Sequence, residues 1–398
     1  MTLKTYILVI NSGSSSLKFS LFSGASKTTD DTELFSGLAE RLGTPEAVLT
    51  WQDASGKQRQ SLDGKGHKAA LEVIVERLEA DYGPPQAIGH RIVHGGEFFN
   101  QSVVVDESVV KNIDACASLA PLHNPAALLG IRALQSLYPE VPQVVVFDTS
   151  FHQTLAPEAF LYAVPKDWYT DLGVRRYGFH GTSHRYVAGQ AVEQLQLDPN
   201  DHGVISAHLG NGCSATAVRN GRAVDTTMGL TPLEGLVMGT RSGDVDPSLH
   251  AYLADRLGLS LDEITEALNR KSGLLGLSGL SNDMRTLIEA ADAGNEDARL
   301  AIDVFCFRLA RKIGGIAMSL SRLDALVFTG GIGENAAVIR SQVLGHLSLL
   351  GFSCDEAANL KPSDHARITR PDSTAALVIP TREEWMIAQD TRRLTEVL

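Results

Sequence analysis

The chain has 398 residues, of which 43% are hydrophobic and 21% charged, and its formal net charge is −12. This length exceeds the usual size of one hydrophobic core and predicts two domains, while the composition is typical of an ordinary globular protein. The acidic balance argues against a nucleic-acid partner, because phosphate backbones are bound by basic surfaces, but it leaves room for a small phosphate ligand held by local cations and backbone amides.

The cysteines and the N-terminus indicate the compartment. The four cysteines lie far apart and form no CxxC pair, which is typical of a reduced cytoplasmic protein without a disulfide framework or a thiolate metal site. The apolar run at residues 6–10 is too short for a secretion signal or a membrane span. We therefore expect a cytoplasmic protein that has no membrane partner.

The first predicted strand, residues 6–10, is followed by the turn Asn11-Ser-Gly-Ser-Ser-Ser16 and by Lys18. A near-continuous apolar run is typical of a strand that is buried on both faces. Hydroxyls, a glycine and a lysine suit a phosphate, although the spacing is not that of a Walker A loop and a second strand, residues 19–22, follows. The alternative is an ordinary polar β-hairpin.

The next segment predicts short strands within residues 32–60 and an amphipathic helix at residues 68–82, where apolar residues recur at helical spacing. Residues 87–96 then predict a short strand that ends in a double glycine and carries Arg91. A buried arginine on a strand needs an anion. The alternative for Arg91 is a structural ion pair.

A helix is predicted at residues 126–137, with Pro125 at its first position, and a buried strand at residues 141–147. Asp148 follows this strand directly. Because α/β folds place catalytic acids at the carboxyl ends of strands, Asp148 is a candidate active-site residue, and the alternative is a helix cap or a turn residue.

Residues 175–184 concentrate two arginines, two histidines and two glycines, and a helix is predicted from Val187. His180 and His184 are four residues apart, as in zinc proteases. Such an enzyme, however, has a glutamate after the first histidine and a helix beneath the pair. Gly181 argues against that interpretation.

The second half of the chain is organised around residues 204–214, an apolar strand that breaks into a turn containing Gly210 and Gly212. A strand that ends in glycines exposes backbone N–H groups with no Cβ to hold a ligand away, which suits a polyphosphate. A strand at residues 215–218 and the pair Asn220-Gly221 predict a tight hairpin.

Two later segments also suggest function. Residues 225–247 lack regular periodicity and contain Arg241, and long irregular segments inside compact domains tend to be functional. A buried strand at residues 325–328 ends in the glycine-rich sequence 329–335, which precedes a predicted helix from Ala336 and suits a nucleotide. Further helices are predicted at residues 247–257, 261–269, 297–320 and 383–394.

The same unit, an apolar strand followed by a polar or glycine-rich turn, recurs at Asn11, Ser206 and Thr329, and Asp148 ends a fourth strand. The repetition predicts an α/β fold with two related domains of the actin-like ATPase (ribonuclease H-like) type and an active-site cleft between them. This pattern is similar to the actin, sugar-kinase and heat-shock ATPase architecture, in which paired phosphate hairpins grip ATP.

We expect an N-terminal domain at residues 1–150, completed by a C-terminal helix at residues 385–398. The C-terminal domain is expected at residues 151–384 and would carry most of the nucleotide site.

These segments together identify a family, because the chain resembles the acetate kinases from end to end. Each motif is long, and the motifs occur in the family's order. They are Ile10-Asn-Ser-Gly-Ser-Ser-Ser-Leu-Lys18, His90-Arg-Ile-Val-His-Gly-Gly96, Phe147-Asp-Thr-Ser-Phe-His152, Tyr177-Gly-Phe-His-Gly-Thr-Ser-His184, His208-Leu-Gly-Asn-Gly212, Met238-Gly-Thr-Arg-Ser-Gly-Asp244 and Thr329-Gly-Gly-Ile-Gly-Glu-Asn335.

The resemblance implies reversible transfer of a phosphoryl group from ATP to acetate, giving ADP and acetyl phosphate, with Mg²⁺ (or Mn²⁺) as the metal and a homodimer as the assembly. It implies that Asn11 and Glu383 are linked to the metal. The residues that it implies for nucleotide binding are Lys18, His208, Leu209, Gly210, Asn211, Gly212, Asp283, Met284, Arg285, Gly331, Ile332, Gly333, Glu334 and Asn335.

The resemblance also implies catalytic roles. Arg91 and Arg241 would hold acetate and the transferring phosphoryl group, His180 would stabilise the transition state, and Asp148 would lie at the metal and carboxylate site. The residues that it places around the acyl group are Arg91, Val93, Leu122, Phe179 and Pro232.

The sequence departs from the family pattern at Arg382, where relatives usually have asparagine, and it leaves open which of Glu383 and Glu384 faces the metal. Propionate kinases are similar and tend to have a smaller residue at the position of Val93, so the valine favours acetate, with propionate as a slower substrate.

Two different classes of protein are alternatives to a kinase. One is a non-enzymatic ATP switch, although we expect no appended peptide-binding domain here, and the second is a hydrolase that uses His180 and His184 on a metal.

Overall fold

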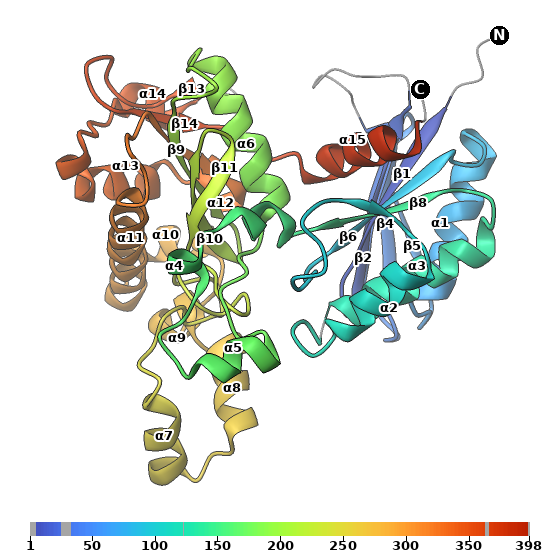
Figure 1. The fold of residues 1–398 in the computed structure, drawn as a ribbon, viewed down its shortest axis with the longest axis horizontal. Coiled ribbons are helices and arrows are strands. Elements are labelled where there is room, and N and C mark those ends of the chain that lie inside the picture. Colours follow the sequence, from blue (N-terminus) through green and yellow to red (C-terminus); the bar gives the residue numbers. More distant parts are fainter. Residues whose placement is uncertain (1–4, 25–32, 122, 363–365, 397–398) are drawn as a thin grey trace. The chain divides into compact units, whose positions relative to one another are not determined.

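The computed structural model describes residues 5–24, 33–121, 123–362 and 366–396 (Figure 1). The chain divides into two compact units, Met1–Phe151 with Arg382–Leu398 (unit 1) and His152–Thr381 (unit 2). Each unit is built on a β-sheet flanked by helices, so the predicted α/β class is confirmed. None of the described helices has the length and apolar character that a bilayer span requires.

The sheet of unit 1 has the strand order β5-β4-β3-β2-β1-β6-β8-β7. Its first strand in the sequence, β1, pairs antiparallel with β2 and parallel with β6, and β6 pairs parallel with β8. The strands are β1 (Tyr6–Ser12), β2 (Ser16–Ser23), β3 (Phe35–Glu40), β4 (Val48–Asp53), β5 (Gly56–Ser61), β6 (Ala87–Ile92), β7 (Val103–Val104) and β8 (Gln143–Phe147).

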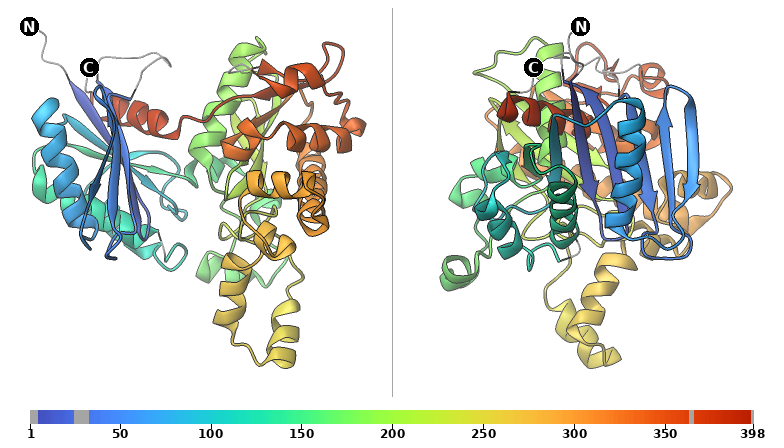
Figure 2. Two further views of the ribbon diagram at one scale, coloured as in Figure 1. Left: turned by 180° about the vertical axis from the view of Figure 1, so that it is seen from behind. Right: turned by 90° about the vertical axis from the view of Figure 1, so that its right-hand side faces the viewer.

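Helices cover both faces of this sheet. Figure 2 shows α1 on one side and α15 on the other. The helices are α1 (His67–Asp81), α2 (Glu107–Ala115), α3 (Asn124–Leu137) and α15 (Glu383–Thr395). As predicted, a proline lies in the first turn of α3.

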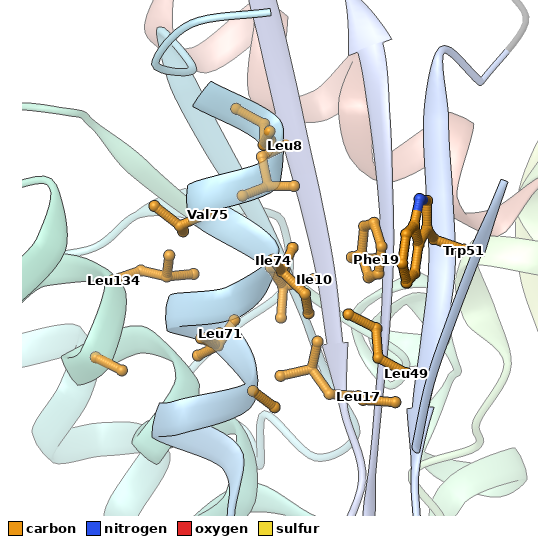
Figure 3. Close-up of a cluster of buried hydrophobic side chains, with 14 of the residues drawn as sticks. Leu8, Ile10, Leu17, Phe19, Leu49, Trp51, Leu71, Ile74, Val75 and Leu134 are labelled. Atoms are coloured by element: carbon orange, nitrogen blue, oxygen red, sulfur yellow. The ribbon is translucent and has the colours of Figure 1, made fainter. Parts of the chain in front are cut away.

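Alternate residues of β1 face the two sides of the sheet. Leu8 and Ile10 pack in one cluster with Ile74 of α1 (Figure 3). On the other face, Val9 belongs to a cluster that contains Ile387 of α15. The prediction that this strand is buried on both faces is confirmed, and each such aliphatic side chain stabilises the fold by about 1.5–3 kcal/mol.

Gly89 of β6 allows α15 to approach the sheet closely. A Cβ at this position would lie 2.4 Å from Oγ1 of Thr391 and 2.7 Å from Cγ2 of Ile387, which is closer than real Cβ contacts. A side chain at residue 89 would therefore push the helix away. The glycine thus helps to position Glu383, at the first turn of α15, relative to β6.

The sheet of unit 2 has the order β11-β10-β9-β12-β14-β13. Its first five strands repeat the pattern of β3-β2-β1-β6-β8, because three antiparallel strands are followed by two that pair in parallel. The predicted relation between two similar α/β halves is visible in this topology. The strands are β9 (Gly203–Leu209), β10 (Cys213–Arg219), β11 (Arg222–Thr226), β12 (Ala325–Thr329), β13 (Ala366–Arg367) and β14 (Ala375–Val378).

The predicted hairpin after β10 is confirmed, since Asn220 and Gly221 both have positive φ (51° and 74°), as a two-residue turn of this type requires. The segment 227–248 contains no helix or strand, as its irregular sequence indicated.

The helical elements from residue 150 onward include several short turns. They are η1 (Ser150–Thr154), α4 (Pro157–Phe160), α5 (Lys166–Leu172), α6 (Gly181–Gln194), α7 (Leu249–Leu257), α8 (Leu261–Arg270), α9 (Gly273–Ser278), α10 (Met284–Asp292), α11 (Glu296–Ala317), α12 (Gly330–Asn335), α13 (Ala337–His346), η2 (Ser348–Leu350) and α14 (Glu356–Leu360).

One predicted helix start and one predicted turn were wrong. The helix expected from Val187 begins at Gly181, because His180 adopts a left-handed conformation (φ 57°) that starts the helix abruptly. The glycine-rich sequence 329–335, expected as a turn, contains α12. The carboxylate of Glu334 accepts a hydrogen bond from Gly330 N at 2.8 Å, which satisfies a helix-terminal amide and offsets the low helix propensity of glycine.

Candidate functional site

Arg91 and Asp148 form an ion pair at the carboxyl ends of two neighbouring parallel strands of unit 1. Arg91 lies on β6 and Asp148 follows β8, and the strands pair with Ile92 opposite Phe147. Nε of Arg91 donates to Oδ1 of Asp148 at 2.8 Å, and Nη2 donates to Oδ2 at 2.7 Å. One guanidinium therefore engages both carboxylate oxygens in a bidentate pair.

This pair is largely buried, since the side-chain exposure is 21% for Arg91 and 2% for Asp148. Burial opposes the charge of Arg91, but Asp148, followed by Glu383 and Glu384, raises the pKa of the guanidinium above its usual value. The structural ion pair, which the sequence left as an alternative for Arg91, is present. It also leaves other N–H groups of the guanidinium for an anion, so the two interpretations are compatible.

The two glutamates at the start of α15 have different surroundings. Oε1 of Glu384 lies 2.5 Å from Nζ of Lys18, in an ion pair with the strand β2. Oε1 of Glu383 is buried and has no hydrogen-bond partner among the described residues. Burial raises the pKa of Glu383 to about 7, while the nearby Arg91 lowers it and Asp148 raises it.

A buried carboxylate oxygen without a partner fits a cation, because an unpaired charge in such a place is costly. Asn11 lies on the same sheet, on β1, opposite Lys18 in the register of β1 and β2. The described residues contain no group of three or more His, Cys, Asp or Glu side chains arranged to hold a metal. The donor set is compatible with Mg²⁺, which commonly takes one or two carboxylates and completes its shell with water and substrate phosphates.

In unit 2, the start of α6 directs two histidines toward strands β9 and β10. His180 is the N-cap, and His184, one turn later, donates its backbone N–H to the carbonyl of His180 at 3.0 Å. Nδ1 of His180 and Nε2 of His184 both lie 2.8 Å from Oγ of Ser214. Nδ1 of His184 lies 2.7 Å from Oγ of Ser206.

These contacts bear on the interpretation as a metal-dependent hydrolase. We expected no helix beneath His180 and His184. This expectation was wrong, because α6 begins at Gly181. Both ring nitrogens of His184 are nevertheless engaged by serine hydroxyls, which leaves none for a metal. The glutamate that a zinc protease would need after the first histidine is replaced by Gly181.

His180 and Arg241 converge beside the glycine turn that follows β9. A Cβ placed at Gly212 would lie 3.4 Å from Nη1 of Arg241 and 3.7 Å from Nε2 of His180. The absence of a side chain at Gly212 thus leaves a space that both groups face. Two N–H donors around one small space are suited to an oxyanion.

Arg241 comes from the irregular segment that precedes α7. Its Nη1 donates to the carbonyl of Pro232 at 3.2 Å and lies 3.7 Å from Sδ of Met238. No carboxylate pairs with it among the described residues, and burial lowers the pKa of its guanidinium. A partly buried cation with only neutral partners is suited to an anionic ligand, because an unpaired charge in such a place is costly.

Gly212→Ala tests whether this space is used. An alanine Cβ fits there at ordinary contact distances, so the fold should persist, but the methyl group would fill the space in which an oxyanion could contact His180 and Arg241. We expect kcat/KM for phosphoryl transfer to fall by about 100-fold, since a misplacement of about 1 Å can cost that much. Gly189→Ala on α6, where an added Cβ meets nothing within 4 Å, is the matched control and should keep normal activity. Equal activity of both variants would contradict the assignment.

A pocket of about 540 Å³ opens in unit 2 between the glycine turn, the start of α10 and the start of α12. Its volume is that of a typical small-molecule site. Asp283 caps α10 by accepting the backbone N–H of Thr286 at 2.9 Å, which fixes the pocket wall. The lining residues that the sequence predicted are Gly210, Asn211, Asp283, Met284, Arg285, Gly331, Ile332 and Asn335.

The remaining predicted nucleotide residues do not line this pocket. Leu209 and Gly333 are buried, and the carboxylate of Glu334 is held by Gly330 N and, at 3.2 Å, by Thr381 N. His208 and Gly212 lie on the histidine side of the turn. Lys18 belongs to unit 1.

The structure adds lining residues that the sequence reasoning missed, namely Asn282, Ile288, Glu289 and Ala336. Asn282 donates to Oδ1 of Asn211 at 3.0 Å and so joins two walls of the pocket. The signal that was overlooked is the helix α10 itself, since Asp283 is a typical N-cap and its apolar residues recur at helical spacing.

The residues predicted around the acyl group are distributed over both units. Val93, partly buried, follows β6 in unit 1. Phe179 is 1% exposed in unit 2, and Pro232 lies beside Arg241. Leu122 lies outside the described residues.

Comparison with known proteins gives consistent results. The model of the acetokinase family matches residues 6–389. The acetate kinase of Deinococcus radiodurans is 54% identical over 390 residues, covering 97% of each chain, and that of Chromobacterium violaceum is 51% identical over 392 residues, covering 98% of each. A solved propionate kinase from Francisella tularensis has a TM-score of 0.93 at 46% identity (98% of this chain, 100% of that one), and Porphyromonas gingivalis acetate kinase has 0.92 at 42% identity (98% and 99%).

Proposed function

The chain belongs to the acetokinase family, and we propose that it catalyses reversible Mg²⁺-dependent phosphoryl transfer from ATP to acetate, giving acetyl phosphate and ADP by direct in-line transfer. The observation that carries this proposal is the convergence of His180 Nε2 and Arg241 Nη1 at Gly212, within the turn that also lines the 540 Å³ pocket. The pocket takes the nucleotide, and the convergence point takes the phosphoryl group.

Acetate needs little activation in this reaction. A carboxylic acid with a pKa near 4 is ionised at neutral pH, so acetate is already a nucleophile and no general base is required. Asp148 is accordingly a positioning residue, since both of its oxygens hold Arg91. The remaining N–H groups of Arg91 bind the carboxylate or the phosphoryl oxygens of the reacting groups.

Phosphoryl transfer depends mainly on positioning and on charge. Negative charge develops on the equatorial oxygens of the transferring group and is stabilised by fixed donors and cations. In unit 2, Arg241 supplies a cation that lacks a carboxylate partner among the described residues, and His180 supplies a ring N–H. Within the glycine turn, the amide of Gly210 donates to the carbonyl of Gly212 at 3.1 Å, so the backbone N–H groups of Asn211 and Gly212 are the ones that would contact a phosphate.

Asn11 and Glu383 are the residues that would hold the metal, and Lys18 would contact nucleotide phosphate. The buried, unpartnered oxygen of Glu383 supports this choice over Glu384, whose carboxylate pairs with Lys18. When bound, Mg²⁺ neutralises charge on the phosphate oxygens and orients them. Mn²⁺, with similar oxygen ligands, would serve in its place.

The substrate preference can be measured directly. We expect MgATP with acetate to give acyl phosphate, trapped as hydroxamate, with kcat/KM at least about tenfold above that of propionate, because one methylene in an apolar pocket is worth about 1–3 kcal/mol. Butyrate should be slower still. Val93→Ala should raise the relative rate of propionate, as expected if Val93 limits the length of the acyl chain. Propionate equal to or ahead of acetate would make the protein a propionate kinase, and no acyl phosphate from any acid would contradict the proposed activity.

We further propose a cytoplasmic homodimer. The thiols support this compartment, since Cys116, Cys213 and Cys306 are free and buried, as is common in a reducing environment. The dimer is suggested by the family alone. Light scattering of the purified protein would test it, and a mass of one chain at working concentration would exclude it.

A further inference from the structure

A chain of hydrogen-bonded side chains leads from the core of unit 2 to Nδ1 of His180. Ser206 of β9 contacts Nδ1 of His184, and Nε2 of His184 contacts Ser214 of β10, which contacts Nδ1 of His180 (2.7, 2.8 and 2.8 Å). Ser206, His184 and Ser214 have no exposed surface. Buried polar atoms of this kind keep their hydrogen bonds, so the direction of each bond can be deduced from the number of hydrogens present.

Ser206 sets the direction of the first hydrogen bond. Among the described residues, Nδ1 of His184 is the hydrogen-bond partner of Oγ of Ser206, so the buried hydroxyl must donate its hydrogen there. His184 is neutral, since burial, His152 and His208 lower its pKa well below the usual value. Its own hydrogen is therefore on Nε2 and is donated to Ser214.

Oγ of Ser214 accepts from His184, so the single hydrogen of this hydroxyl is available to a second partner. Within the described chain, that partner is Nδ1 of His180. This nitrogen accepts, so the ring hydrogen of His180 is on Nε2. In the opposite direction His184 would donate to Ser206, whose hydroxyl hydrogen would have no acceptor among the described residues. That arrangement carries a desolvation cost that the first one avoids.

Two further groups lie next to the ring of His180, and one of them, the Arg241 cation, opposes a positive charge on it. The ring of His180 stacks on that of His208, with centroids 4.3 Å apart and planes at 28°. Arg241 lies at the convergence point with Nε2. A like charge nearby disfavours the protonated ring. His208 is held in the same manner, because Thr381 donates to Ser183 and Oγ of Ser183 lies 2.8 Å from Nδ1 of His208.

We propose that Ser206, His184 and Ser214 are positioning residues that hold His180 as the neutral tautomer with its hydrogen on Nε2. His180 is then a ready hydrogen-bond donor to an equatorial oxygen of the transferring phosphoryl group, while Arg241 supplies the positive charge. No proton moves in this step. The role on phosphoryl oxygen rests on the proposed kinase function, whereas the tautomer itself is a property of the free protein.

Nuclear magnetic resonance of the ¹⁵N-histidine-labelled full chain tests the tautomer directly. Two-bond ¹H–¹⁵N correlations near neutral pH distinguish protonated from unprotonated ring nitrogens, and His180→Gln identifies the signals of His180. We expect an unprotonated Nδ1 and a protonated Nε2. A protonated Nδ1, in either the neutral or the cationic ring, would overturn the proposal. This result does not depend on activity.

Kinetics of hydroxyl variants test the function of the chain. Removing a transition-state donor outright costs about 10²–10³-fold in rate, so partial loss of the correct tautomer in Ser206→Ala should lower kcat by about tenfold, with KM values unchanged within about twofold. Ser206→Thr keeps the hydroxyl and should retain normal kcat. A rise in KM at unchanged kcat, or Thr behaving like Ala, would contradict the positioning role. A wild-type chain that forms no acyl phosphate would refute the proposed function alone, because the NMR result would still stand.

Discussion

Replacing Arg241 by alanine is expected to lower kcat for acetyl phosphate formation by roughly 10³–10⁵-fold, the range of an arginine that stabilises charge during phosphoryl transfer. The guanidinium is partly buried, has no carboxylate partner among the described residues and faces the space beside Gly212. The charge that it would stabilise appears on the phosphoryl group during transfer. Since Arg241 does not line the 540 Å³ pocket, binding of MgATP should be retained.

Initial rates and calorimetric titration of MgATP would separate the two effects. Arg308→Ala is a suitable control, because this exposed arginine of the same unit donates to the carbonyl of Asp244 and its loss removes the same charge. Arg241→Lys should recover little activity, since an ammonium group lacks the planar fork of a guanidinium. Near-normal turnover of Arg241→Ala would contradict the assignment, and loss of nucleotide binding would place Arg241 in the nucleotide site instead.

The parts of the site that the sequence predicted are those written in local patterns. A strand that ends in glycine, as at Gly210 and Gly212, can be read from a few consecutive residues, and the structure places Gly210, a predicted nucleotide residue, on the wall of the 540 Å³ pocket. The repeated strand and turn also predicted two similar halves, which the matching strand orders bear out. Such features need no knowledge of what lies across the sheet.

The parts that the sequence left open or missed depend on strand register and on helix phase. The bidentate contact of Arg91 with Asp148 follows from the pairing of β6 with β8, which the sequence does not specify. Glu383 and Glu384 are neighbours in sequence, yet adjacent helical side chains point about 100° apart, so only the structure separates a buried oxygen from an ion pair. The serine contacts of His184 likewise come from two strands and one helix.

The separation of the two glutamates leads to the second large effect. Glu383→Gln should lower kcat by about 100-fold or more and raise the Mg²⁺ concentration for half-maximal rate by about 10–100-fold, since altered metal ligation commonly has effects of this size. The carboxamide has nearly the same shape as the carboxylate but lacks its charge. The measurement is initial rate against Mg²⁺ at saturating ATP and acetate.

Glu384→Gln is the matched control. Its ion pair with Lys18, whose side chain is 48% exposed, contributes little to stability, so both kcat and the Mg²⁺ requirement should change by no more than about threefold.

Thermal unfolding without metal adds a second test of Glu383. A buried carboxylate oxygen with no hydrogen-bond partner is destabilising, so Glu383→Gln should unfold at the same temperature as the unmodified chain or higher. A variant that loses activity because it unfolds would show a lower midpoint. If Glu384→Gln, and not Glu383→Gln, were to raise the Mg²⁺ requirement, the metal would belong to the carboxylate beside Lys18, and the unpartnered oxygen of Glu383 would need another explanation.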